Sequence, residues 1–518
     1  MPSEQRLHPA SIVFAFAKSA RSFLLPGLLV LFSVGRSSGG AGGQFGHLPA
    51  NWELWLMLLM IPSGVAAIAR YISYRIRYEG TEIVIRSGIL FRNERHIPYA
   101  RIQNLDAVQN LVHRLVGVIE VRVETGGGRE PEARISVLPE QAFAEMRRRV
   151  FEGRGQALPA PASDERGDTQ AEQPRTLLHL GLRDVLLFGF LENRGFIAIG
   201  AAYGAAWEMD LFETFWGDFF QAKWFAPYLV PTRAFQEMMR GGFSITLAFV
   251  LLAGLGGLVI VARLISMAWG AVRFYDFHLT RAGNDLHTTY GLLTRVATTI
   301  PSVRVQTLTV RQSPLYRFMK RFSVQVETAG GQHGSDRGRR ERVWLAPLIR
   351  DVELPRLLRE MLPEVDVPAL DWQPPHPRAF RRAVRPPLAL ALLLTASVAA
   401  LAGWWSLALL PLALTWAMLV ARKYVDNLGW VATDQVVAFR SGWLWKSTTL
   451  ARVAKIQAVT QLESPFDRRA TMRRLRIDTA GAGERSHRVD IPYLARETAA
   501  ALSLKLAERA AQTAFSTR

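Results

Sequence analysis

The sequence predicts an α+β membrane protein with about six transmembrane helices in three pairs, each pair followed by a domain of short antiparallel strands with a C-terminal helix. Two observations predict this fold. Apolar segments long enough to cross a bilayer occur along the chain, and a block of spaced residues appears three times, each time after two such segments. In every copy the successive gaps from Gly to Gln, Arg and Thr are 15, 11 and 11 positions. The blocks consist of Gly88, Gln103, Arg114 and Thr125; Gly291, Gln306, Arg317 and Thr328; and Gly442, Gln457, Arg468 and Thr479.

The apolar segments differ in how clearly they predict a span. Lys18 and Arg21 interrupt the first, so a secretory signal peptide is the alternative interpretation there. Only Gly403–Ser406 separates the last two, which predicts a tight helical hairpin. The stretch from His179 to Arg194 is amphipathic, and we expect it to lie along the membrane interface. The six segments are 12–34, 52–69, 186–207, 243–265, 386–403 and 404–421.

Basic residues near the ends of these segments predict the orientation. They follow the second, fourth and sixth segments and precede the fifth, whereas the loop at 35–51 has one charge, Arg36. Because cytoplasmic loops carry an excess of Lys and Arg, both termini and all three copies are predicted to be cytoplasmic. The membrane is therefore expected to be an inner (plasma) membrane.

The repeated residues fit a β module. Gly88, Gly291 and Gly442 are expected to turn the chain between two strands, because Gly adopts positive φ without a steric penalty. The strand before the repeated Thr alternates apolar and polar residues, as in Val121 and Val123, which predicts one buried face. Gln103, Gln306 and Gln457, with Thr125, Thr328 and Thr479, are taken as structural residues of the repeat.

These patterns give the domain boundaries. Gly153 to Arg175 is rich in Pro, Ala and charged residues and is expected to be a flexible linker. The expected divisions are transmembrane pair 1 (1–73), β domain 1 (74–152), the linker (153–175), an interfacial helix and transmembrane pair 2 (176–273), β domain 2 (274–363), a linker and transmembrane pair 3 (364–423) and β domain 3 (424–512). We call the three β domains copy one, copy two and copy three.

Composition excludes several functions. The chain of 518 residues has no cysteine, which removes disulfides, thiol nucleophiles and thiolate metal sites. The net charge of +19 is compatible with nucleic-acid binding, but positive-inside bias in large cytoplasmic domains explains it better. We therefore expect no nucleic-acid partner. No zinc-protease motif, nucleophile elbow or Walker glycine loop is present, so we expect no catalytic site, cofactor or metal.

The repeats also resemble a known family, the bacterial pleckstrin-homology (PH) domain membrane proteins of the YdbS/YdbT type, in a long form with three modules. The residues that carry the resemblance are Gly-Ile-Leu, His-Ile-Pro and Arg-Ile-Gln within 88–103, Gly-Leu-Leu, Thr-Ile-Pro and Arg-Val-Gln within 291–306, and Val-Glu-Thr-Ala-Gly-Gly at 326–331. The resemblance implies a PH-like fold for each copy, with two packed antiparallel sheets closed by a helix. Copy three departs from it at Arg452, which replaces Pro98 and Pro301 and puts the turn there in question.

Three arginines are the candidates for a functional contact. Arg114, Arg317 and Arg468 each follow a predicted loop, where a guanidinium could bind a lipid phosphate or a partner. The alternative is that each arginine holds a loop through backbone carbonyls. The expected function is a non-enzymatic scaffold whose partners are membrane lipids and a protein partner or further copies of itself. The alternative function is transport, or lipid or peptide export, through the helices.

Overall fold

The computed structural model describes most of the chain beyond residue 70. The described residues are 71–88, 92–125, 133–143, 145–146, 149, 175–208, 245–283, 285–328, 343–479 and 489–512, with short stretches earlier (4–6, 8–12, 14, 64–65 and 68–69). The predicted segments 12–34 and 52–69 and the linker fall almost wholly outside the described residues. The chain divides into two compact units: Met1–Glu172 with Leu293–Thr299, and Gln173–Leu292 with Ile300–Arg518.

The first unit contains copy one. Its core includes Ile76, Ile83 and Val123, none of them accessible to solvent. Residues Thr294–Ala297 cluster with this unit and pair antiparallel with Ala107–Asn110. One sheet has the order β1 (Glu4–Arg6), β2 (Arg75–Tyr78), β3 (Glu82–Ser87) and β4 (Asn93–Pro98). In a second set of paired strands the order is β7 (Ala133–Pro139), β6 (Val118–Thr125) and β5 (Ile102–Asn110). Helix α3 (Leu111–Val116) joins β5 to β6.

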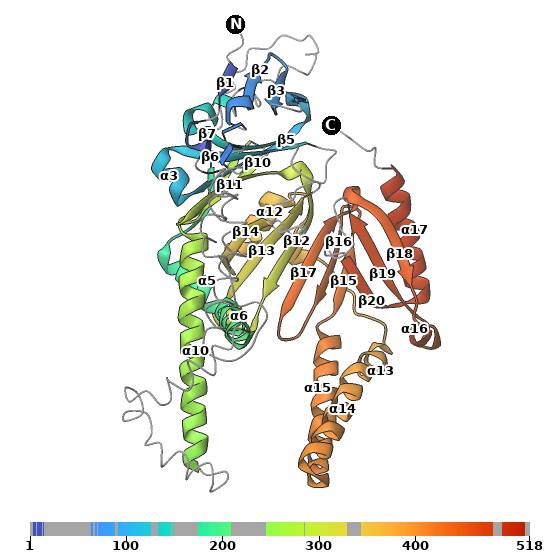
Figure 1. The fold of residues 1–518 in the computed structure, drawn as a ribbon. Coiled ribbons are helices and arrows are strands. Elements are labelled where there is room, and N and C mark those ends of the chain that lie inside the picture. The colour runs from blue at the N-terminus through green and yellow to red at the C-terminus, as the bar shows by residue number, and fades with distance from the viewer. Residues whose placement is uncertain are drawn as a thin grey trace, which may run out of the picture. The chain divides into compact units, whose positions relative to one another are not determined.

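The second unit holds copy three and most of copy two, and Figure 1 shows their strands and the helices below them. Strands β8 (Arg175–Leu180), β9 (Phe277–Ala282) and β10 (Asp285–Tyr290) pair in that order. A six-stranded antiparallel sheet has the order β14 (Val343–Arg350), β13 (Arg321–Thr328), β12 (Val305–Gln312), β17 (Lys446–Arg452), β16 (Val436–Ser441) and β15 (Gly429–Ala432). A three-stranded sheet follows as β18 (Ile456–Leu462), β19 (Met472–Thr479) and β20 (Val489–Ala495).

The repeated glycines and alternating strands take the predicted conformations. Gly88, Gly291 and Gly442 have φ values of 96°, 114° and 90°. A Cβ at Gly442 would lie 1.9 Å from the Trp445 carbonyl oxygen, so the turn excludes any side chain there. The apolar residues of the alternating strands are fully buried, as expected for one core-facing side: Val121 and Val123, Val324 and Val326, and Leu475 and Ile477.

Short helices close copies two and three. Leu357 and Leu358 of α12 (Leu354–Met361) are buried against the core of copy two, and α17 (Arg496–Gln512) contributes Leu502 and Leu506 to the core of copy three. Figure 1 shows α17 lying along the sheet of β18 to β20. Two shorter helices are α11 (Pro314–Phe318), after β12, and α16 (Pro465–Arg469), after β18.

Three described helices are long and apolar enough to cross a membrane, and a bent pair brings the number to four if it forms one span. The hairpin at 386–421 is confirmed: α14 (Arg385–Ala402) and α15 (Leu410–Asp426) pack together around Gly403. Of the six predicted spans, the structure therefore describes at most four. The others are α10 (Ile245–Phe274) and the bent pair, α5 (Leu182–Leu191) with α6 (Arg194–Glu208).

Two predictions for residues 179–207 need correction. His179 does not begin an interfacial helix, because it pairs with His278 near the end of β8. The segment 186–207 is not one straight helix, because α5 and α6 meet at an angle of 58°. Sequence hydropathy missed the bend because apolar residues continue on both sides of it.

Candidate functional site

Copies two and three are joined by direct pairing of β12 with β17, which we call the junction (Figure 1). Six consecutive residues of β12, Thr307 to Gln312, lie opposite Ala451 to Lys446. The hydroxyl oxygens of Thr309 and Thr449 are 3.5 Å apart, and Leu308 and Leu450 belong to one shared core. The second half of copy two and the first half of copy three thus form one continuous sheet.

Arg317, one of the three candidate arginines, lies beside the junction. Its Nη2 donates to the backbone oxygen of Trp443 at 2.6 Å and to that of Leu444 at 3.3 Å. These carbonyls belong to the turn after Gly442, so the guanidinium of copy two holds the turn between β16 and β17 of copy three. Binding to backbone carbonyls was the alternative interpretation of this arginine, although the carbonyls belong to the next copy and not to its own loop.

Arg452, the departure from the repeat, makes a second arginine contact at the junction. Its backbone angles, φ −70° and ψ 133°, match those of Pro301 at −63° and 124°, so the turn is kept. Its guanidinium donates to the backbone oxygen of Met361 at 2.8 Å and lies 3.5 Å from the Glu364 carboxylate. Arginine at this position therefore ties copy three to the C-terminal helix of copy two.

The other predicted site residues have different surroundings. Arg468 is exposed, and Arg114 lies in α3 of copy one. Gln306 is buried and donates to the Arg304 oxygen at 3.2 Å, whereas Gln457 is exposed. Thr328 and Thr479 end β13 and β19, and Thr125 ends β6; the side chains of Thr125 and Gln103 lie outside the described residues. Arg114 belongs to the first unit, and the other two arginines belong to the second.

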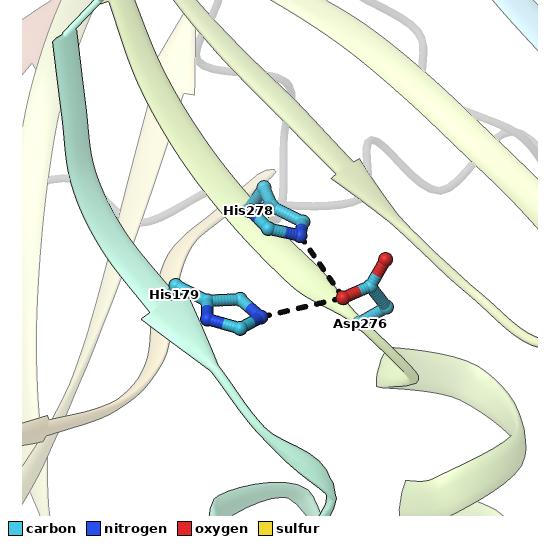
Figure 2. Close-up of side chains that lie close together, drawn as sticks. All are labelled: His179, Asp276 and His278. Atoms are coloured by element: carbon cyan, nitrogen blue, oxygen red, sulfur yellow. Dashed lines mark hydrogen bonds and ion pairs between the residues drawn. The ribbon is translucent and has the colours of Figure 1, made fainter.

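A polar cluster that the sequence did not predict lies after α10. His179 on β8 and His278 on β9 stack with ring centroids 4.2 Å apart, and both Nε2 atoms approach Asp276 Oδ1, at 3.3 and 2.9 Å (Figure 2). Partial burial acts to raise the pKa of Asp276, but the hydrogen bonds from the two histidines lower it below its ordinary value. Asp276 also has a φ of 52°, which an Asp adopts rarely.

This cluster has the donor atoms of a metal site. Two imidazoles and one carboxylate are ligands that Zn²⁺ accepts, and their ligand atoms lie within 4.8 Å of one another. The two rings, however, are nearly parallel, with an interplanar angle of 13°, and both Nε2 atoms already hydrogen-bond the same oxygen, Asp276 Oδ1. The arrangement fits a hydrogen-bonded pair of histidines on one aspartate better than a formed tetrahedral site.

The bend between α5 and α6 is held by α10. Arg263 donates to the backbone oxygens of Phe190 and Glu192 at 2.6 and 2.9 Å, and the Gly195 N–H donates to Ser266 Oγ at 2.7 Å. A Cβ at Gly195 would lie 1.8 Å from the Ala262 oxygen, so glycine allows the two backbones to meet. Polar groups freed by the bend are thus satisfied by a neighbouring helix, as an apolar environment requires.

The fold and these sites define a membrane protein that carries repeated β modules closed by helices. The Bacterial PH domain family matches the chain three times, at residues 23–154, 234–362 and 386–510, and the chain belongs to this family. The chain is also similar to the UPF0699 transmembrane protein YdbT of Bacillus subtilis (strain 168), with 21% identity over 483 residues that cover 91% of this chain and 92% of that protein. No solved structure matches the chain. The predicted family resemblance is confirmed.

Proposed function

We propose that this chain is a non-enzymatic scaffold of the bacterial inner membrane, with six helices in three pairs and three cytoplasmic PH-like copies that bind a protein partner or further copies of the chain. The observation that carries the proposal is the junction, where copies two and three share one sheet and two arginine contacts. An array of binding modules in one chain suits a scaffold, because several weak contacts made by one molecule multiply in strength.

The charge distribution supports the cytoplasmic side for the copies. Arg273 ends α10 next to copy two, and Arg422 and Lys423 lie in the last turn or so of α15 before copy three. An anionic inner leaflet would attract such residues by about 1 kcal/mol each. Membrane lipids are therefore proposed as a second, less specific partner of the basic surfaces, including Arg468.

Transport, or lipid or peptide export, is the second candidate, and one observation favours it. Transporters place broken helices at their substrate sites, and α5 and α6 form such a break. Here Arg263 and Ser266 already occupy the polar backbone at the break. A substrate would have to displace these contacts, so the scaffold is the better-supported function.

The absence of cysteine makes the topology directly testable. Trp404 lies exposed in the α14–α15 hairpin, and Glu497 lies exposed on α17 of copy three. We expect a membrane-impermeant maleimide to label Trp404→Cys in intact spheroplasts and Glu497→Cys only after the membrane is opened. Labelling in the opposite order would place the copies outside the cell and reject a cytoplasmic scaffold.

Crosslinking coupled to mass spectrometry in native membranes tests the scaffold itself. Crosslinks from the copies to one recurring protein, or to another copy of the chain, are expected. If no such crosslink forms while deletion of the gene changes lipid flux across the membrane, the export function replaces the scaffold.

A further inference from the structure

The two places where one copy pairs with the next use the same register. Val310, four positions after Gln306, lies opposite Thr448, six positions after Gly442. Within the first unit, Ala107, four positions after Gln103, lies opposite Ala297, six positions after Gly291. The repeat therefore includes a rule for joining copies: the strand that contains the repeated Gln pairs with the third strand of the following copy.

Copy three has the equivalent strand, β18, and none of the described strands pairs with its second edge. In the described part of the chain, β18 is the edge of its sheet and pairs only with β19. The side chains of β18 are accordingly more exposed than those of β12. Thr307 and Thr309 of β12 are buried under β17, whereas the equivalent Ala458 and Thr460 of β18 are exposed.

Copy one has the complementary edge. Strand β4 ends its sheet in the described residues, and Asn93 to His96 are all exposed. By position in the repeat, β4 of copy one corresponds to β17 of copy three. Within the described residues, β18 of copy three and β4 of copy one are thus both edge strands, at the positions of the first and second members of the junction.

We propose that β18 of one molecule pairs antiparallel with β4 of a second copy of this chain, in the register of the junction. This inference rests on the proposed function and deepens it, because it names the partner. The register sets Thr460 opposite Arg95, Gln461 opposite Glu94, and Val459 opposite His96. None of these pairs places like charges opposite each other, which would destabilise an antiparallel pair.

The contact is head to tail, because the two surfaces that meet are different. Repetition of such a contact gives a ring if it closes and a filament if it does not. Val459 opposite His96 replaces Leu308 opposite Leu450, so this contact buries less apolar surface than the junction and is weaker. Confinement of both molecules to one membrane raises their effective concentration and favours a weak contact.

A disulfide between two differently tagged molecules tests the pairing. One molecule carries Arg95→Cys and the other Thr460→Cys, and both are expressed together and oxidised in native membranes. The expected result is a crosslinked dimer that carries both tags. The matched positive control is Thr309→Cys with Thr449→Cys in one chain, whose hydroxyl oxygens are 3.5 Å apart in the native protein, and which should form a disulfide within that chain.

Every other outcome rejects the pairing. A homodimer of Thr460→Cys as abundant as the mixed dimer would mean that β18 pairs with itself. A 95–460 disulfide that forms only when both substitutions are in one chain would mean that the chain closes on itself. Crosslinking of Thr460→Cys to a different protein would reject a second copy as the occupant but leave the scaffold function standing. Absence of any crosslink while the 309–449 control forms would reject the contact.

The labelling of Glu497→Cys in the same membranes separates this inference from the proposed function. Cytoplasmic labelling without the mixed dimer rejects only the pairing of β18 with β4. Labelling from outside rejects the scaffold as proposed, whatever crosslinks form. A third variant, Thr460→Lys, adds a charge opposite Arg95 and should reduce co-purification of two tagged copies several-fold, because charged residues on an edge strand oppose pairing.

Discussion

Strands β12 and β18 occupy the same place in the repeat but have different surroundings. Residues Val305 to Val310 of β12 are all buried, whereas only Ile456 is buried in β18. Both strands pair on one side with the next strand of their own copy, β13 and β19. The difference arises on the other side, where β17 covers β12 and no described strand covers β18.

This contrast shows that the environment of a repeated strand depends on whether another copy follows it. The residues at equivalent positions of the two strands also differ. The buried Thr307 and Val310 of β12 correspond to Ala458 and Gln461 of β18, which are exposed and half-buried. A strand that keeps its pairing geometry but loses its apolar cover is expected to contribute less to stability and to remain available for another strand.

The largest expected effect comes from truncating equivalent core positions of the two strands. Leu308→Ala removes a side chain that is 2% exposed at the junction and should lower the free energy of unfolding by about 2–4 kcal/mol. Val459→Ala at the half-buried equivalent in β18 should lower it by about 1 kcal/mol or less. Thermal or denaturant unfolding of the purified full chain measures both. Equal losses would mean that the two strands are equally covered.

An intermediate effect is expected from the paired arginines. Arg317→Met loses two bonds to backbone oxygens of the following copy and should lower the free energy of unfolding by about 1–2 kcal/mol. Arg468→Met changes an exposed side chain, so the stability should stay within about 0.5 kcal/mol of the parent. The same unfolding measurement compares the two variants. A larger loss of stability for Arg468→Met than for Arg317→Met would mean that the contacts of Arg317 with the next copy do not set the difference between the two arginines.

The smallest effect is a dependence on pH at the junction. Partial burial, followed by the positive charges of Arg317 and Arg440, lowers the pKa of Lys446, which pairs with Gln312 in β12. The unfolded chain then binds more protons than the folded chain between the two pKa values, so this residue makes stability rise as the pH increases through that range. As the pH rises through that range, the amide hydrogen exchange of β17, corrected for its intrinsic pH dependence, should slow relative to that of β19. Lys446→Met should remove the difference; if the difference remains, another group causes it.

Much of each copy could be predicted from sequence, because the signals are local. Glycine at 88, 291 and 442 predicts a turn with positive φ, and alternation at Leu475 and Ile477 predicts a buried face; both are observed. The hairpin around Gly403 is signalled by two apolar runs with a short polar break. These features depend on residues a few positions apart, where periodicity and steric rules apply directly.

The candidate sites depend on residues far apart in the chain. Thr309 meets Thr449, and His179 meets Asp276 and His278, although long segments separate the partners. Arg452 could be noticed as a departure from the repeat, but nothing nearby in sequence identifies Met361 as its acceptor. The bend after α5 was missed because hydropathy is the same before and after it, while its cause, Arg263 and Ser266, lies on another helix.

The sequence by itself determined that there are three equivalent modules, where their turns and buried faces lie, and that they alternate with apolar segments. Only the tertiary structure decided that one module continues into the next through β12 and β17, that Arg317 and Arg452 hold that junction, and that β18 is left at an edge. The physical reason is that the spacing within a strand fixes which face is buried, whereas the partner of its edge is chosen by packing between distant segments.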